Sequence, residues 1–377
     1  MSKKILFIIG TRPELIKVFP LIKRLKEIDN SNFRVVSTGQ HKELLESYWK
    51  VFDVQPDYEL DIMIKNQSLS SLTGRVLIQL QGFIDSIKGD FSPDVIVSQG
   101  DTTTVMASSM VSFFNNIEFA HIEAGLRSFN LNHPFPEEFN RKVSSIIASY
   151  HFAPTEVSKS NLVKEGISED KIFVVGNTIV DTIQYFQKSS ILKNHLFFNE
   201  SLRDVQGSTV LVTCHRRENH ENIGELIDST KELAILHPNL TFIWPVHPNP
   251  RVYNKVLYSK LNDQPNIIIT EPLEYLDLLK LISISEKIIT DSGGIQEEAP
   301  SFSVPVLILR ETTERPEAVD AGMSILVEMK SSAIIDAFCD FSPGSDLLEG
   351  HNPYGDGKTS ERILKVLRVN GSSSYGI

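Results

Sequence analysis

The sequence has few cysteines and no long apolar run. Its only two cysteines, Cys214 and Cys339, lie inside apolar segments, which predicts reduced, buried thiols rather than a disulfide framework. The longest apolar runs, residues 5–9 and 304–309 among them, fall far short of the roughly 20 residues that span a bilayer. No signal peptide is expected, because the first apolar stretch ends at Gly10 without a small-residue cleavage site. We therefore predict a cytoplasmic protein that does not enter the membrane.

Positive charge is also scarce. The 377 residues include 37 Lys and Arg against 48 Asp and Glu, a net charge of −11, with no long basic run. Such a surface argues against nucleic acid or anionic lipid as the main partner. A phosphorylated small molecule stays compatible with it, because a local cationic pocket does not show in a net charge.

Several motifs of enzyme chemistry are missing. The sequence has no spaced Cys/His set for zinc, no Walker loop, no Gly-x-Ser-x-Gly elbow and no Gly-x-Gly-x-x-Gly after the first predicted strand. These absences weaken metalloenzyme, kinase, serine hydrolase and simple dehydrogenase interpretations. We expect neither a metal nor a redox cofactor.

Short β-rich apolar runs alternate with helix-period segments along the whole chain, which is typical of parallel sheets covered by helices. Strands are predicted at residues 5–9, 34–37, 95–98, 119–122, 151–153, 172–175, 210–214, 241–245, 267–270, 287–290 and 305–309. The clearest helices are predicted at residues 14–28, 42–52, 72–87, 137–148 and 156–165. The regularity fails over the polar segment 187–208, which predicts a linker between a first domain, 1–186, and a second, 209–358. The predicted class is α/β, with two doubly wound, Rossmann-like domains facing each other across a cleft.

Ligands of such sheets bind beyond the carboxyl ends of the strands. The first strand leads into Gly10-Thr11-Arg12-Pro13-Glu14, with Lys17 further along the helix. A glycine turn into a helix N-terminus suits an anion. Arg12 could add a bidentate contact to a phosphate, because arginine donates two parallel hydrogen bonds. The alternative is an ordinary strand-to-helix turn with two solvated cations.

Carboxylates follow the next strands of this domain. Asp101 follows the third predicted strand, Glu123 ends the fourth and Glu137 begins the next helix. Taken singly, Asp101 is compatible with a helix N-cap, and the neighbouring Glu138 with a solvated acid in the first helical turn. Together, carboxylates that converge on a cleft can divide acid and base roles, because each raises its neighbours' pKa.

The second domain offers imidazoles, guanidiniums and a glycine-rich turn. His215 and Arg216 follow its first strand and His247 its second, although a lone histidine is more often structural than functional. Ser292-Gly293-Gly294 leads into a helix and would let the backbone approach a diphosphate, while Glu298 suits a ribose diol.

The segment 310–317 carries two more arginines, although it is also compatible with a salt-bridged loop. This arrangement suits a nucleotide-diphosphate sugar as ligand. The carboxylates of the first domain would contact the sugar ring, and the anion sites of the second domain would bind the nucleoside diphosphate.

The chain resembles the non-hydrolysing UDP-N-acetylglucosamine 2-epimerases of bacteria, which have the GT-B fold. The resemblance covers essentially the whole chain. Its motifs are Gly10-Thr11-Arg12-Pro13-Glu14, Gly100-Asp101-Thr102-Thr103, Glu123-Ala124-Gly125-Leu126-Arg127, His215-Arg216-Arg217-Glu218, Asp291-Ser292-Gly293-Gly294-Ile295-Gln296-Glu297-Glu298, Thr313-Glu314-Arg315-Pro316-Glu317-Ala318 and His351-Asn352-Pro353-Tyr354-Gly355-Asp356-Gly357.

The resemblance implies roles for these residues. Asp101, Glu123 and Glu137 would be the acid/base carboxylates, with His215 as an essential cleft residue. The UDP contacts that follow from the motifs and the cationic turns are Arg12, Lys17, Arg216, Ser292, Gly293, Gly294, Glu298 and Arg315. The resemblance also implies that residues 359–377 contain a helix crossing back to the first domain, that the protein is a homodimer, and that its product supplies a surface polysaccharide.

Some family members are regulated by a second UDP-N-acetylglucosamine molecule. The chain resembles them at Gln40, His41, Arg216 and His247, whereas they usually have Gln at the position of Glu43 and Arg at that of Asn66.

The implied reaction is reversible C2 epimerisation by anti elimination of UDP to 2-acetamidoglucal and readdition. The alternatives are a hydrolysing epimerase that releases N-acetylmannosamine and UDP, a GT-B glycosyltransferase, and a non-catalytic nucleotide-sugar sensor.

Overall fold

The chain divides into two compact units. The computed structural model describes residues 3–28, 32–40, 42–64, 67–344 and 352–369. The first unit comprises Met1–Thr182 and Gly355–Ile377, and the second comprises Ile183–Tyr354. Helix α7 (Thr178–Lys188) leaves the first unit and enters the second.

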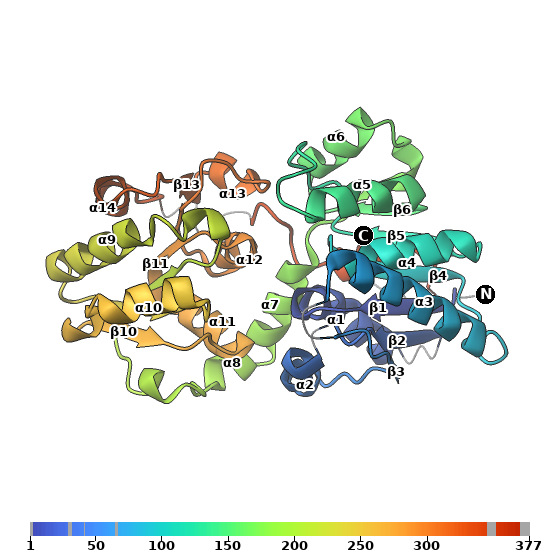
Figure 1. The fold of residues 1–377 in the computed structure, drawn as a ribbon, viewed down its shortest axis with the longest axis horizontal. Helices are drawn as coiled ribbons and strands as arrows, with labels where there is room; N and C mark the ends of the chain where they lie inside the picture. The colour runs from blue at the N-terminus through green and yellow to red at the C-terminus, as the bar shows by residue number, and fades with distance from the viewer. Residues whose placement is uncertain (1–2, 29–31, 41, 65–66, 345–351, 370–377) are drawn as a thin grey trace. The chain divides into compact units, whose positions relative to one another are not determined.

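The first unit is built on a parallel sheet of seven strands in the order β3-β2-β1-β4-β5-β6-β7 (Figure 1). All five residues of β1 are buried, so helices cover the sheet on both faces. The strands are β1 (Ile5–Ile9), β2 (Phe33–Ser37), β3 (Tyr58–Glu59), β4 (Val95–Gln99), β5 (Glu118–Ile122), β6 (Tyr150–Ala153) and β7 (Ile172–Val174).

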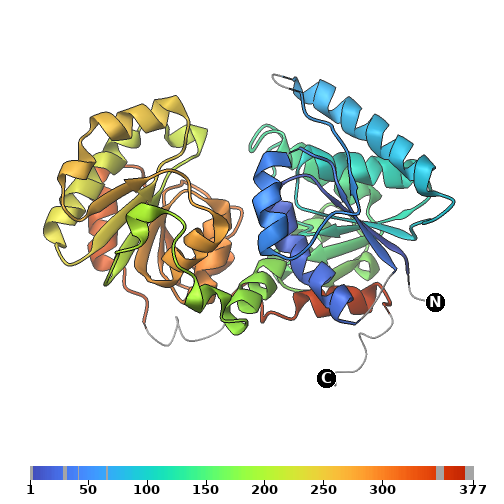
Figure 2. The same cartoon turned by 90° about the horizontal axis from the view of Figure 1, so that it is seen from below.

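Helices α3 and α4 pack in one hydrophobic cluster with alternate strand residues such as Leu6 and Ile8. Helix α16 packs against α1 within the first unit and is drawn in red in Figure 2. Asp181 of α7 accepts the backbone N–H groups of Thr359 and Ser360 at the start of α16. The helices are α1 (Arg12–Glu27), α2 (Lys42–Val51), α3 (Leu69–Ile87), α4 (Thr103–Phe114), α5 (Glu137–Ile147), α6 (Glu156–Lys164) and α16 (Thr359–Val366).

The second unit has a six-stranded parallel sheet in the order β10-β9-β8-β11-β12-β13. Val210 and Val212 of β8 belong to one hydrophobic cluster and Leu211 to another, so this sheet too is covered on both faces. The strands are β8 (Thr209–Thr213), β9 (Thr241–Pro245), β10 (Ile267–Thr270), β11 (Ser285–Thr290), β12 (Val306–Ile308) and β13 (Ser324–Leu326). The remaining helices are α8 (Ile191–Asn194), α9 (Ile223–Leu236), α10 (Pro250–Tyr258), α11 (Tyr275–Ser283), α12 (Gly293–Glu298), α13 (Glu317–Asp320) and α14 (Ser331–Asp340).

These two sheets confirm the predicted class of two doubly wound, Rossmann-like α/β domains. In each sheet the strand order reverses beside the first strand of the unit, between β1 and β4 and between β8 and β11. Loops after the two strands at such a reversal diverge and leave room for a ligand.

Two predictions need correction. Cys339 is exposed, not buried, because it lies one residue beyond the buried Phe338 on α14 and therefore turns away from the core. The segment 187–208, predicted as a linker, contains α8 and places Phe197 and Leu202 in a hydrophobic cluster of the second unit. No helix in the described part of the chain is both long and apolar enough to cross a membrane.

Candidate active site

The strand reversal in the first unit places the turn after β1 beside the turn after β4. Gly10 begins the first turn, where a Cβ atom would lie 2.3 Å from Oγ1 of Thr104 and 2.9 Å from Oγ1 of Thr38. Only glycine fits this close approach. Arg12 follows two residues later, and its guanidinium carbon lies 5.5 Å from the centre of the buried Tyr48 ring.

Glu123 is held by two side chains at the end of β5. Lys17 of α1 forms an ion pair with Glu123, and the two side chains are only 10% and 7% exposed. The amide of Gln99, at the end of β4, donates a hydrogen bond of 2.9 Å to the same carboxylate. Glu123 itself adopts a left-handed backbone with φ of 66°, which costs free energy for a residue with a side chain. The surroundings thus fix both the backbone and the carboxylate of Glu123.

Asp101 is paired with Arg141 of α5. Nε and Nη2 of Arg141 lie 2.9 and 2.7 Å from Oδ2 of Asp101, and Nδ2 of Asn140 donates to the Asp101 carbonyl at 2.8 Å. The N-cap of α4 is Thr102, which accepts the Val105 N–H, so the N-cap interpretation of Asp101 is wrong. The carboxylate of Asp101 is 25% exposed and faces Arg141.

The two glutamates that begin α5 have different surroundings. Glu138, predicted as a solvated acid, is fully buried, and this prediction was wrong. It accepts a hydrogen bond from Arg141 and the backbone N–H groups of Ser128 and Phe129, each at 3.1 to 3.2 Å. It therefore ties the loop after β5 to α5. Glu137 precedes it at the first position of α5 and is partly buried.

In the second unit, Asp291 organises the turn after β8. This buried carboxylate at the end of β11 accepts the backbone N–H groups of His215 and Arg216 and lies 3.0 Å from Nδ1 of His215. Burial acts to raise the pKa of Asp291, but the hydrogen bond and charge of His215 outweigh it and hold the pKa well below its ordinary value. The imidazole of His215 is 43% exposed beyond this contact. Asp291 thus fixes the backbone position and the ring orientation of His215.

The glycine-rich turn lies in contact with a guanidinium. A Cβ atom on Gly293 would lie 2.9 Å from Nη1 of Arg315, so glycine lets this cation reach the backbone at the start of α12. Arg315 forms an ion pair with the buried Glu297, and Ser292 is the N-cap of α12. Glu298 is buried at the end of this short helix.

Comparison with known proteins identifies the family. Residues 23–368 match the family described as UDP-N-acetylglucosamine 2-epimerase. The chain belongs to this family. It is 40% identical to the UDP-N-acetylglucosamine 2-epimerase of Campylobacter jejuni, with both chains covered completely, and 42% identical to that of Yersinia pestis over 97% of this chain and 98% of the other. Its structure is similar to that of the Neisseria meningitidis enzyme bound to UDP-N-acetylglucosamine, with a TM-score of 0.86, 40% identity and coverage of 96% and 99%.

The residues predicted to take part in regulation by a second substrate molecule lie in both units. Gln40 accepts a hydrogen bond from the hydroxyl of Thr104, while His41 lies outside the described residues. The His247 ring lies 6.4 Å from the ring of His215. Burial lowers the pKa of His247, and the charges of nearby histidines lower it further. Regulation by a second substrate molecule stays a prediction.

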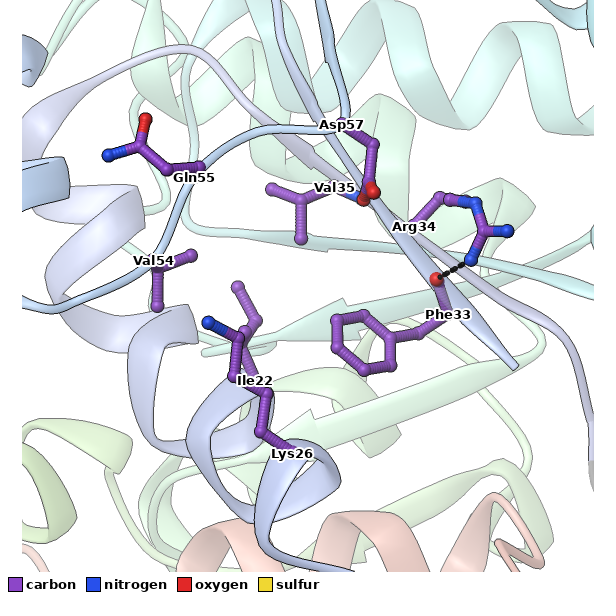
Figure 3. Close-up of a pocket in the computed structure, with 8 residues that line it drawn as sticks. All are labelled: Ile22, Lys26, Phe33, Arg34, Val35, Val54, Gln55 and Asp57. Atoms are coloured by element: carbon purple, nitrogen blue, oxygen red, sulfur yellow. Dashed lines mark hydrogen bonds between the residues drawn. The ribbon is translucent and has the colours of Figure 1, made fainter. Parts of the chain in front are cut away.

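A cavity of about 200 Å³ in the first unit is lined by none of the candidate site residues (Figure 3). Phe33, Arg34 and Val35 line it at the amino end of β2, whereas the carboxylates follow the carboxyl ends of strands. Figure 3 shows the Arg34 guanidinium bonded to the Phe33 carbonyl. Among the described residues, no group of three or more His, Cys, Asp or Glu side chains could hold a metal ion.

The side chains that support the candidate residues were not predicted from the sequence. These are Glu14, Gln99, Arg141 and Asp291. The position of Arg141, four residues after Glu137 on the predicted helix, placed it on the same helix face and was an available signal. Nothing local to Gln99 or Asp291 indicates its partner, because both partners come from other strands.

Proposed function

We propose that the chain is a non-hydrolysing epimerase that interconverts UDP-N-acetylglucosamine and UDP-N-acetylmannosamine. The observation that carries the proposal is the pairing of two carboxylates with buried cations at neighbouring strand ends. Asp101 is held by Arg141, and Glu123 by Lys17. The Neisseria meningitidis relative bound to UDP-N-acetylglucosamine supports the substrate.

The chemistry of the sugar requires an indirect route. The C2 hydrogen of N-acetylglucosamine has no adjacent carbonyl to stabilise a carbanion, so simple deprotonation is slow. In the proposed elimination, a carboxylate takes the C2 proton while the C1–O bond breaks, UDP leaves with the bonding electrons and a C1–C2 double bond forms. Readdition of UDP at C1 and protonation of C2 from the opposite face give the epimer.

Two faces of C2 require two proton-handling groups. We assign this work to the set Asp101, Glu123 and Glu137, with His215 as a further catalytic residue. Asp101 and Glu123 lie at the ends of β4 and β5, which pair directly, and Glu137 begins the helix whose Arg141 holds Asp101.

Breaking the C1–O bond leaves negative charge on UDP, and fixed cations and N–H groups stabilise it. We assign UDP binding to Arg12, Lys17, Arg216, Ser292, Gly293, Gly294, Glu298 and Arg315. Glu298 would accept hydrogen bonds from the ribose hydroxyls, while the absence of a side chain at Gly293 allows Arg315 to lie against the turn. This scheme uses neither a metal nor a redox cofactor.

Product analysis separates the proposal from its alternatives. The protein, treated with chelator and dialysed, is incubated with UDP-N-acetylglucosamine alone, and the products are separated by anion-exchange chromatography. The proposal predicts UDP-N-acetylmannosamine in equilibrium with substrate. Free N-acetylmannosamine with UDP would indicate the hydrolysing enzyme, and turnover only with a sugar acceptor would indicate a transferase.

We also propose that two copies of the chain associate. Helices α3, α4 and α5 pack side by side in the first unit and carry exposed apolar side chains, Ile78, Phe113, Phe114 and Ile146. Sedimentation of the wild-type chain and of a Phe113→Ser, Phe114→Ser variant tests this: a dimer that dissociates in the variant is expected. Supply of a surface polysaccharide and a cytoplasmic location stay predictions.

A further inference from the structure

Glu14 is a buried carboxylate that the proposed chemistry does not use. It lies in the first turn of α1 and is 1% exposed. Its Oε2 accepts the Gly10 N–H at 2.6 Å, and its Oε1 accepts the hydroxyls of Thr11 and Thr102 at 2.9 and 2.8 Å. We call these three hydrogen bonds the Glu14 bridge. They connect the turn after β1 with the turn after β4.

Both of these turns carry proposed site residues. Arg12 directly follows Thr11, and Asp101 directly precedes Thr102. Strands β1 and β4 are paired neighbours, so the two turns start from the same edge of the sheet. Thr104, at the start of α4, also lies close to Gly10, since a Cβ atom built on Gly10 would come within 2.3 Å of its Oγ1.

We propose that Glu14 is a positioning residue that fixes the turn of Asp101 against the turn of Arg12. This inference rests on the proposed function, in which Asp101 handles a proton and Arg12 binds the diphosphate. The Glu14 bridge keeps these two groups in one geometry while charge moves from C2 to the leaving UDP. A misplacement of about 1 Å can cost about 100-fold in rate, so such a connection matters for turnover.

Burial of Glu14 is costly, which argues against a packing role. Desolvation raises its pKa to about 7, although its three donors act to lower it. An apolar side chain would avoid this cost but could not connect the turns. A protonated Glu14 keeps the bridge, because a threonine hydroxyl can turn to accept the added proton.

Variants of Thr102 test the bridge with Asp101 and Arg12 left in place. Thr102→Val removes the bond from the turn after β4, and Thr102→Ser keeps it. Because Thr102 also caps α4, the matched control is Thr155→Val, which removes the equivalent N-cap of α6 in the same unit. The thermal midpoint, UDP affinity and kcat are measured for each variant.

We expect Thr102→Val to lower kcat at least about tenfold beyond Thr155→Val, with UDP affinity within about threefold of wild type and a similar fall in midpoint. Thr102→Ser should restore kcat, and Glu14→Gln should retain far more of it than Glu14→Ala. Equal kcat in Thr102→Val and Thr155→Val would overturn the inference. A wild-type chain without any epimerisation would instead overturn the proposed function.

Discussion

Arg141 contacts Asp101 through two nitrogens, with Nε and Nη2 at 2.9 and 2.7 Å from the same carboxylate oxygen. The same guanidinium bonds the fully buried Glu138, which accepts the N–H groups of the loop after β5. A proton-handling carboxylate and a neighbouring loop are therefore connected through one arginine.

Arg141→Lys should keep the charge but lose the two-point contact. We expect kcat to fall at least about tenfold and the free energy of unfolding to fall by about 1–3 kcal/mol, because a hydrogen bond to a charged group is lost. Steady-state kinetics and urea unfolding measure the two effects. Arg24→Lys, at a surface pair with Glu27 on α1, is the control and should change neither.

Asp291→Asn should reduce stability in a pH-dependent way. A carboxylate whose pKa is lowered in the folded state stabilises the fold above its unfolded pKa, and this stabilisation is lost as the pH falls. The stability deficit of the variant should therefore be largest near pH 7 and shrink below about pH 4, since 3.8 is the ordinary pKa.

Urea unfolding of wild type and Asp291→Asn at several pH values checks this, with the exposed Asp228→Asn in the same unit as control. We also expect kcat to fall in Asp291→Asn, because His215 loses its charged partner. A deficit that grows on acidification would contradict this account of Asp291.

The effect of Glu14→Gln on the free energy of unfolding should depend on pH in the opposite direction to that of Asp291→Asn. A buried acid with a raised pKa keeps its proton in the folded state while the unfolded chain releases it, so its contribution to stability falls as pH rises from 4.5 to about 7. The change is on the order of 3 kcal/mol. The free energy of unfolding of the variant, measured relative to wild type, should accordingly rise between pH 5 and pH 8. A difference independent of pH would show that Glu14 titrates normally.

Glu298→Ala should weaken UDP binding at least about tenfold, since a buried carboxylate that bonds a ribose diol contributes charge-assisted hydrogen bonds. Isothermal titration calorimetry with UDP measures the affinity. Glu286→Ala removes an exposed carboxylate near the amino end of β11 and serves as the control. Equal affinities would remove Glu298 from the UDP site.

The strands and the residues at their ends were predictable, because buried parallel strands are short apolar runs and the motifs follow them directly. Strands β1, β9 and β10 coincide with their predicted ranges. Helix α4 was not among the clearest predicted helices, because most of its residues are buried and no polar face reveals a helical period. Strand β3, which was not predicted, has only two residues, too few to show a pattern.

The side chains that hold the candidate site residues in place were less predictable than the site residues themselves. Glu137 and Glu138 are adjacent acids in one helical turn, and only the rotation of α5 decides that Glu138 is buried against Arg141. The local sequence places Asp291 just before a helix, yet its hydrogen-bond donors come from the turn after β8. Such contacts join segments far apart in sequence, so local patterns do not contain them.

The central claim is that carboxylates of the first unit move the C2 proton of a UDP-sugar. Proton NMR of UDP-N-acetylglucosamine in deuterated buffer follows this step directly in the wild type and in Asp101→Asn, Glu123→Gln and Glu137→Gln. The account predicts deuterium at C2 with the wild type, and exchange at least about 100-fold slower in each variant with UDP affinity retained. Exchange at the wild-type rate in these variants, or none with the wild type, would contradict it.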